Sequence, residues 1–251
     1  MTFGEKLIRA YFDFAYNVAY DFTTARLNRY GKLQSTCVSK LKFRDADKVL
    51  CVGVGTGNEV LHVLQINRNV KIVGVDYSKT ALRKAYRKAL VRGKEIEVLI
   101  MDARRLEFAA GSFDKVLCIH VMDFVEDNRQ VTSEILRVLK EGGQFVITYP
   151  SDKEGPKLGW NLVKDIIHTN LHSGKHPVKA FLVLIAQMLM GLVYLPLVCR
   201  PNKRSYSRRE LEATINQVRT GDIQIIEEDS VYQDFIVYGR KSVKGGKSDA
   251  Y

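Results

Sequence analysis

Three glycines and one carboxylate have the types and spacing of a nucleotide-binding site. Gly53, Gly55 and Gly57 directly follow an apolar run. Glycines at such a point let the backbone turn sharply and let a ligand approach the main chain closely. Asp76 ends the next apolar run, where a carboxylate can accept hydrogen bonds from both hydroxyls of a ribose. These four residues predict a site for a molecule that contains adenosine.

A third apolar run is followed by Asp102 and Ala103. They place an acid and a backbone amide where the edge of an adenine ring would lie. The glycine spacing is G-x-G-x-G, whereas proteins that hold the pyrophosphate of a dinucleotide have G-x-G-x-x-G. A nicotinamide-dependent enzyme is therefore the weaker interpretation of this loop.

His120 and Asp123 follow a fourth apolar run and are the candidate catalytic residues. An imidazole titrates near neutral pH, so His120 is suited to act as a general base. Two alternatives remain open: His120 could line the pocket only through its backbone, and Asp123 could cap the helix that follows. Tyr149, after a fifth run, is either a pocket residue or a packing residue.

Alternating apolar runs and amphipathic stretches must position these residues, and this alternation is typical of βαβ units. It predicts an α/β fold, a Rossmann-like doubly wound sheet of seven mostly parallel strands. Such a sheet binds ligands beyond the carboxyl ends of its strands. We expect strands at 49–54, 71–76, 97–101, 115–119, 144–149, 223–228 and 234–240, and helices at 3–20, 24–41, 58–65, 79–92, 128–139 and 207–218.

Two local signals define helix ends. Gly142 and Gly143 after the helix at 128–139 indicate a glycine C-cap. Ser207 with Glu210 three residues later indicates a capping box at the start of the last helix.

As a set, these stretches resemble the motifs of class I S-adenosylmethionine-dependent methyltransferases, particularly the group that contains the ubiquinone/menaquinone-biosynthesis enzymes. The resemblance covers roughly residues 16–149 and, more loosely, 206–240. The matching stretches are 49–57, 73–78, 102–103, 113–114 and 137–143.

The resemblance implies S-adenosylmethionine as the cofactor and assigns roles to individual residues. The three glycines would line its methionine and ribose parts, Asp76 would hold the ribose and Asp102 the adenine amino group. Tyr20, with Asp21 and Arg26 after it, would belong to a segment that closes over the cofactor. The implied cofactor-binding set is Tyr20, Cys51, Gly53, Gly55, Gly57, Asp76, Tyr77, Asp102, Ala103, Ile119 and His120.

Cys51 departs from the family pattern, because members usually have an acid there that helps to orient the methionine end. A thiol is smaller and neutral at pH 7. The consequence is either weaker cofactor binding or a site that no longer transfers methyl groups. The second outcome supports an alternative function, a non-catalytic membrane-associated or partner-binding protein that retains the methyltransferase fold.

The segment 180–199 is twenty residues long, contains no charge and is flanked by lysines and arginines. Its length fits a transmembrane helix, but the strands after it must return to the same sheet. Three interpretations remain open. The segment is a helix lying in the interface of an anionic membrane, a lid over an apolar substrate pocket, or a buried core helix.

Composition bounds the remaining expectations. The 251 residues carry a net charge of +11, which favours acidic partners without identifying them. We expect a helical cap at 1–45, a methyltransferase domain at 46–240 with an insertion at 152–205 between strands five and six, and a flexible tail at 241–251.

The N-terminus does not resemble a signal peptide, and the four cysteines show no metal spacing. We therefore expect a cytoplasmic protein, peripheral to the inner face of the membrane if the first interpretation of 180–199 holds.

No metal site is expected. His168, His172 and His176 lie four residues apart, but Gly174 and Pro177 interrupt a helix there.

The stretch 118–121 lacks the Asn/Asp-Pro-Pro-aromatic element of many nucleic-acid amino-methyltransferases, so a nucleic-acid acceptor is disfavoured. The sequence thus predicts a methyltransferase for a hydrophobic, lipid-like or membrane-resident acceptor, and leaves the oligomeric state undetermined.

Overall fold

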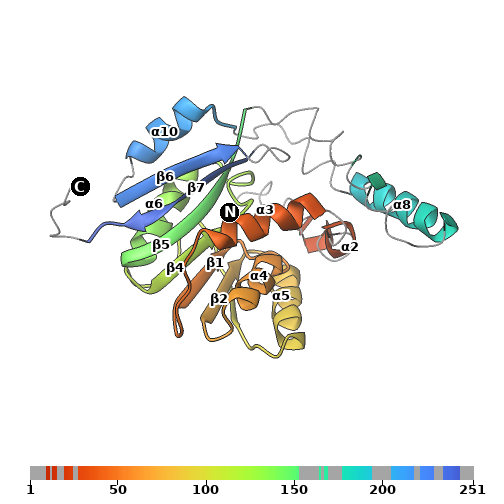
Figure 1. The fold of residues 1–251 in the computed structure, drawn as a ribbon, viewed down its shortest axis with the longest axis horizontal. Coiled ribbons are helices and arrows are strands. Elements are labelled where there is room, and N and C mark those ends of the chain that lie inside the picture. Colours follow the sequence, from red (N-terminus) through yellow and green to blue (C-terminus); the bar gives the residue numbers. More distant parts are fainter. Residues whose placement is uncertain are drawn as a thin grey trace.

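A computed structural model describes residues 10–11, 13–15, 20–24, 28–152, 164, 167–168, 177–193, 205–217, 221–228 and 234–243. Within these residues seven strands form one sheet in the order β3-β2-β1-β4-β5-β7-β6 (Figure 1). The strands are β1 (Lys48–Val52), β2 (Lys71–Asp76), β3 (Glu97–Ile100), β4 (Phe113–Cys118), β5 (Leu139–Pro150), β6 (Gly221–Glu228) and β7 (Asp234–Lys241).

The first five strands are parallel, whereas β7 is antiparallel to both β5 and β6. The strand order reverses between β1 and β4, which both lie at the centre of the sheet. Ligands of such sheets bind beyond the carboxyl ends of the strands at this switch point. The predicted α/β, Rossmann-like and mostly parallel architecture is confirmed.

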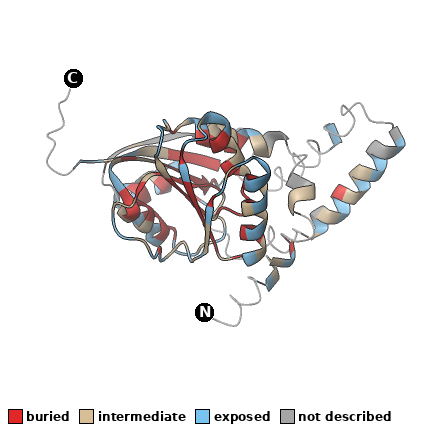
Figure 2. Cartoon of the chain, turned by 90° about the horizontal axis from the view of Figure 1, so that it is seen from below, coloured by how far each residue is buried: buried red, intermediate tan, exposed pale blue. Residues whose placement is uncertain are grey.

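Helices cover both faces of the sheet. Buried side chains of α3 (Asn28–Ser39), α4 (Asn58–Ile66) and α5 (Lys79–Val91) form one apolar core with the sheet. Those of α6 (Asn128–Val138) and α10 (Arg208–Gln217) form a second core on the opposite face. In Figure 2 the buried residues accordingly concentrate in the sheet and on the helix sides that face it.

The two predicted helix ends had different outcomes. The capping box is present, because Glu210 N–H lies 3.3 Å from the Ser207 hydroxyl oxygen and Ser207 N–H donates to the Glu210 carboxylate at 2.9 Å. The glycine C-cap was wrong: α6 ends at Val138, and Leu139 is already extended and begins β5. Gly142 instead adopts a positive φ of 70° inside β5, where the pairing register with β4 shifts.

The N-terminal prediction is only partly covered by the described residues. Of the helix expected at 3–20, residues 10–11, 13–15 and 20 are described, and Arg26 lies outside the described part. The helix expected at 24–41 is present as α3, while the short α2 (Asp21–Thr24) ends where that helix was expected to begin.

The chain leaves and re-enters the sheet domain at one place around the insertion. Ser151 pairs with Tyr206 in an isolated bridge, and Asp152 N–H donates to the Tyr206 carbonyl at 2.8 Å. The division into a cap, a domain with its insertion and a tail stays a prediction.

Helix α8 (Pro177–Leu192) contains the first part of the apolar segment and lies to one side of the sheet domain (Figure 1). Its apolar side chains are 40–61% exposed at seven positions, so the interpretation as a buried core helix was wrong. They are Val178, Phe181, Leu182, Ile185, Met188, Leu189 and Leu192. Among the described residues, no helix has both the length and the apolar character that a membrane crossing needs.

Candidate functional site

The loop between β1 and α4 turns on three glycines with positive φ: 63° at Gly53, 50° at Gly55 and 79° at Gly57. Side chains rarely tolerate this left-handed region. At Gly53 there is also no room for a side chain, because an added Cβ would lie 2.2 Å from Cγ2 of Val121. The sequence therefore folds here into a tight turn that requires glycine at these positions.

Asp76 ends β2 and is only 6% exposed. Its two carboxylate oxygens accept hydrogen bonds from Gly55 N–H at 2.9 Å and from Ser78 N–H at 2.8 Å. Burial raises the pKa of Asp76 to about 6, although these backbone amides oppose the rise. The carboxylate thus joins the glycine loop to the turn after β2 and remains largely ionised at pH 7, as an acceptor for ribose hydroxyls must.

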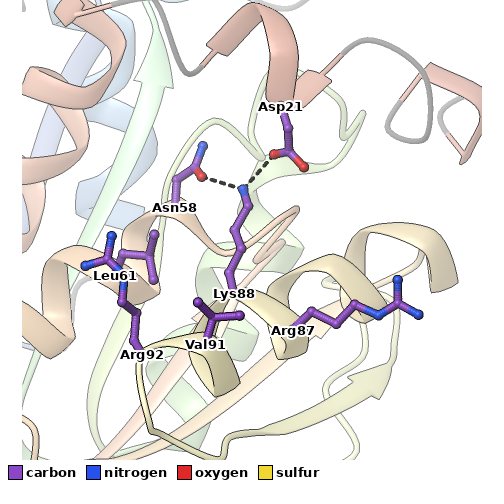
Figure 3. A pocket seen from close by; sticks show the side chains of 7 residues that line it. All are labelled: Asp21, Asn58, Leu61, Arg87, Lys88, Val91 and Arg92. Atoms are coloured by element: carbon purple, nitrogen blue, oxygen red, sulfur yellow. Dashed lines mark hydrogen bonds and ion pairs between the residues drawn. The ribbon is translucent and has the colours of Figure 1, made fainter.

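The segment before α3 closes over the glycine loop (Figure 3). Asp21 Oδ1 accepts from the Thr56 hydroxyl at 2.7 Å and from Lys88 Nζ at 2.6 Å. Lys88 also donates to Asn58 Oδ1 at 2.8 Å. Tyr20 shares a hydrogen bond of 2.7 Å with the Tyr30 hydroxyl. These contacts attach the segment around Tyr20 and Asp21 to α3, α5 and the glycine loop, and its expected role in closing over the cofactor stays a prediction.

A cavity of about 460 Å³ lies between α4 and α5, next to Asp21 and Lys88. Neither Asp76, Asp102 nor His120 lines it, so it is distinct from the predicted cofactor site. Its lining residues are Asp21, Asn58, Leu61, Arg87, Lys88, Val91 and Arg92.

Asp102 lies after β3, as predicted, but its carboxylate already has a partner. Arg104 donates to it from Nη2 at 2.6 Å and from Nε at 3.0 Å, and these hydrogen bonds lower the pKa of Asp102 despite partial burial. If Asp102 binds the adenine amino group, as the resemblance implies, the carboxylate is shared with Arg104.

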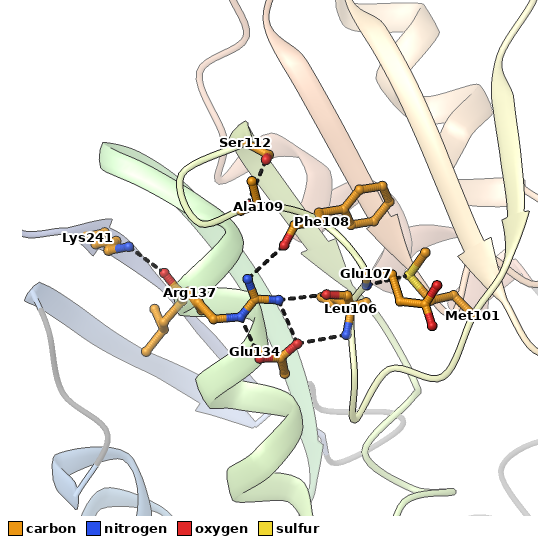
Figure 4. A network of polar contacts seen from close by, with 10 residues as sticks. Met101, Leu106, Glu107, Phe108, Ala109, Ser112, Glu134, Arg137 and Lys241 are labelled. Carbon is orange, nitrogen blue, oxygen red and sulfur yellow. Dashed lines mark hydrogen bonds and ion pairs between the residues drawn. The ribbon is translucent and has the colours of Figure 1, made fainter.

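The loop beyond Asp102 and Ala103 is fixed by a network from α6 (Figure 4). The Arg137 guanidinium donates to the carbonyls of Leu106 at 2.6 Å and Phe108 at 2.7 Å, and Glu134 accepts from Leu106 N–H at 2.7 Å. A guanidinium with several fixed donors suits this task. The wall expected beside the adenine is thus anchored to the sheet domain.

His120, directly after β4, lies in a cluster of polar groups. Its Nδ1 is 3.1 Å from Oδ2 of Asp234 and 3.7 Å from Oδ2 of Asp123. The imidazole stacks on the Tyr30 ring at a centroid distance of 5.1 Å. His120 also has a positive φ of 56°, a strained conformation that concentrates at functional sites in proteins.

Burial alone would lower the pKa of His120, but the carboxylates of Asp234 and Asp123 raise it well above its ordinary value. These carboxylates therefore favour the protonated imidazole. In this state it can donate a proton or stabilise a negative charge on an acceptor, and it acts as a general base only at higher pH.

Three further residues of the predicted cofactor-binding set are Cys51, Ile119 and Tyr77. Cys51 is fully buried, and burial raises the pKa of its thiol well above the ordinary value, so it stays neutral. Ile119 is buried at the end of β4. Tyr77 packs against Ala15, and its role in cofactor binding stays a prediction.

Contacts in the structure also decide between the alternatives that the sequence left open for Asp123 and Tyr149. Asp123 does not cap α6, because Asp127 does so by accepting from Gln130 N–H at 3.0 Å. Tyr149 is buried and shares a 2.6 Å hydrogen bond with Thr132, which indicates packing. Among the described residues no acidic, histidine or cysteine cluster suits a metal; His172 and His176 lie outside them.

Sequence reasoning missed Asp234 and Tyr30 because both come from elements distant in the sequence. It also missed Glu59, a buried carboxylate in the first turn of α4. A signal for Glu59 was present, since an acid interrupts the apolar face formed by Val60, Val63 and Leu64.

Comparisons with known proteins agree with this geometry. Residues 50–147 match the family described as a methyltransferase domain. Phosphatidylethanolamine N-methyltransferase of Cereibacter sphaeroides is 32% identical over 130 residues, which cover 51% of this chain and 61% of that protein. Demethylmenaquinone methyltransferase of Thermus thermophilus is 32% identical over 109 residues, which cover 43% of this chain and 50% of that protein.

A solved structure shows the same fold. It is an S-adenosylmethionine-dependent methyltransferase from Aquifex aeolicus, with a TM-score of 0.53 at 16% identity, covering 82% of this chain and 88% of that one. The chain spans only about half to three fifths of the two curated relatives.

The fold, the residues at the strand ends and these matches show that the chain contains a class I S-adenosylmethionine-dependent methyltransferase domain. S-Adenosylmethionine is the cofactor of this class. The predicted class and cofactor are confirmed, and the roles of individual residues remain predictions.

Proposed function

We propose that this protein transfers the methyl group of S-adenosylmethionine to a hydrophobic, lipid-like acceptor that it takes from a membrane surface. The observation that carries the proposal is the exposed apolar face of α8, which is attached to the segment that covers the cofactor site.

The seven exposed apolar residues of α8 recur every three or four positions and therefore share one face of the helix. Figure 2 shows exposed residues along α8, whereas Gln187 is buried. Contiguous exposed apolar surface of this kind marks a site of protein or membrane interaction. Arg208 and Arg209, also exposed, follow the insertion and can pair with anionic headgroups.

Helix α8 is connected to the cofactor side of the sheet. The Tyr11 hydroxyl donates to the Val193 carbonyl, directly after α8, at 2.5 Å. Val193, Tyr11 and Tyr77, the neighbour of Asp76, all pack against Ala15. A ligand at the inner end of α8 would thus lie close to the turn that holds the ribose.

In the proposed reaction the residues of this chain bind the cofactor, orient the acceptor and exchange a proton with it. S-Adenosylmethionine supplies an electrophilic methyl group on a sulfonium. Asp76 and the glycine loop hold the cofactor, and alignment with exclusion of water is the main catalytic demand. Because Nδ1 of His120 faces the carboxylates, Nε2 is the atom that exchanges a proton with the acceptor.

The names of the relatives support a lipid-like acceptor. They specify phosphatidylethanolamine and demethylmenaquinone, both of which are lipid-soluble. The matched segments cover only 51% and 43% of this chain, so the names indicate a class of acceptor rather than one compound.

Flotation with anionic liposomes tests the membrane part of the proposal. The wild type should float with the vesicles, and the double variant Phe181→Ser/Leu189→Ser should remain at the bottom of the gradient. The matched control Ile66→Ser/Val243→Ser, which alters residues that are 53% and 58% exposed elsewhere, should float like the wild type. Equal flotation of the two double variants would contradict the proposal.

A further inference from the structure

Glu59 is a buried carboxylate that the predicted site did not include. It lies in the first turn of α4, two residues after Gly57, and is 7% exposed. Glutamate is almost never buried unless it is paired. Its position therefore requires a physical reason.

Ionisable groups from both sides of the loop surround Glu59, but none neutralises it. No other described side chain donates a hydrogen bond to its carboxylate or forms an ion pair with it, and the ammonium of Lys88 binds Asp21, Thr56 and Asn58 instead. The groups whose charges influence Glu59, or are influenced by it, are Tyr30, Cys51, Asp76, Lys88, Cys118 and His120.

Burial raises the pKa of Glu59 to about 8. Its own backbone amide, Lys88 and His120 oppose the rise, and Asp76 adds to it. Without a ligand, most Glu59 side chains therefore carry a proton at pH 7. A cation placed beside Glu59 would favour the ionised carboxylate and release that proton.

The position of Glu59 identifies the kind of cation. Asp76, which holds the ribose in our assignment, accepts from Gly55 on the same loop, and Glu59 follows that loop on the other side. In the arrangement that the family resemblance implies, the methionine moiety of the cofactor lies along the glycine loop. Cys51 is buried and neutral there, so it cannot supply a negative charge.

We infer that Glu59 binds the α-ammonium group of the methionine moiety of S-adenosylmethionine. This inference rests on the proposed function and adds a cofactor-binding residue to it. The buried carboxylate and the incoming ammonium compensate one another's charge, which offsets the cost of burying each.

Calorimetric titration in two buffers of different ionisation enthalpy measures the proton released on binding. At pH 7, a carboxyl with a pKa of about 8 should release roughly 0.9 proton per S-adenosylmethionine bound. At pH 9.5 the release should give way to a net uptake, because Glu59 is already ionised and the largely neutral α-amino group of the ligand gains a proton when it binds as a cation. S-Adenosylhomocysteine, which keeps the α-ammonium, should release the proton as well.

Glu59→Gln and a truncated ligand provide the controls. The variant should lose the proton release and bind S-adenosylmethionine roughly 10- to 100-fold more weakly. Methylthioadenosine, which lacks the ammonium, should release no proton. It should bind the variant and the wild type equally, which also verifies that the variant is folded.

The outcomes separate this inference from the proposed function. If the wild type does not bind S-adenosylmethionine, both are overturned. If it binds but the proton release is unchanged in Glu59→Gln, or is equal for methylthioadenosine, only the role of Glu59 is overturned.

Discussion

Nδ1 of His120 lies 3.1 Å from Oδ2 of Asp234, although the two residues are far apart in the sequence. Strand pairing explains their proximity. β5 lies between β4 and β7, and its last residue, Pro150, pairs with Asp234 at the start of β7. His120 follows β4 at the same edge, so the antiparallel β7 delivers a carboxylate to the carboxyl ends of the parallel strands.

Asp234→Asn should lower the pKa of His120, because an adjacent opposite charge is removed while burial remains. The folded pKa in the wild type is raised, so the ion pair contributes stability that is fully present below about pH 6.5 and is lost as the pH rises through the folded pKa. NMR titration of the imidazole protons measures the shift. Urea unfolding should show the largest difference in free energy of unfolding below pH 6.5. An unchanged His120 titration would show that Asp234 does not act on it.

The rate of methyl transfer should depend on pH through the same pair if His120 is the base. In the wild type, kcat/KM should rise about tenfold per pH unit until the pH passes the raised pKa of His120. Asp234→Asn should move the inflection to lower pH, whereas Asp45→Asn, an exposed carboxylate, should leave the profile unchanged. If the profile of Asp234→Asn matches that of the wild type, His120 is not the titrating base.

Gly53→Ala should destabilise the protein by about 2–4 kcal/mol, because it combines a left-handed φ of 63° with a contact of 2.2 Å to Val121. Gly31→Ala is the matched control. Gly31 lies inside α3 with no atom within 4 Å of an added Cβ, so that change should stabilise by about 0.5–1 kcal/mol. Urea unfolding compares the two. A Gly53→Ala variant as stable as the wild type would contradict the steric account of the loop.

Arg137→Ala should loosen the loop after Asp102, because the carbonyls of Leu106 and Phe108 lose their donor. We expect a loss of about 1–2 kcal/mol in the free energy of unfolding and a higher KM for S-adenosylmethionine. Arg208→Ala removes only an exposed pair with Glu212 and should change neither quantity measurably. Equal KM values in the two variants would mean that this loop does not shape the adenine pocket.

Periodicity was sufficient for most of the fold. The predicted strand at 71–76 coincides with β2, because buried strands have continuous apolar runs that end in polar residues. The glycine pair after α6 misled the prediction, since a positive φ at Gly142 suits a helix cap and an irregular strand equally well. Only the pairing of β5 with β4 distinguishes them.

The site residues likewise fall into those that the sequence could locate and those that it could not. Asp76 and the glycines follow their strands directly, so local sequence located them. The partners of His120 depend on which strands become neighbours, and the burial of Glu59 depends on how α4 packs. A linear pattern does not contain that information.

The central claim is tested by supplying methyl-labelled S-adenosylmethionine together with vesicles made from a total lipid extract. After extraction into organic solvent, the label should be found in the lipid fraction with the wild type. It should be absent with Asp76→Asn, whose weakened cofactor binding calorimetry would verify independently. Label that stays in the aqueous phase with the wild type, although S-adenosylmethionine binds, would contradict the assignment of a lipid-like acceptor.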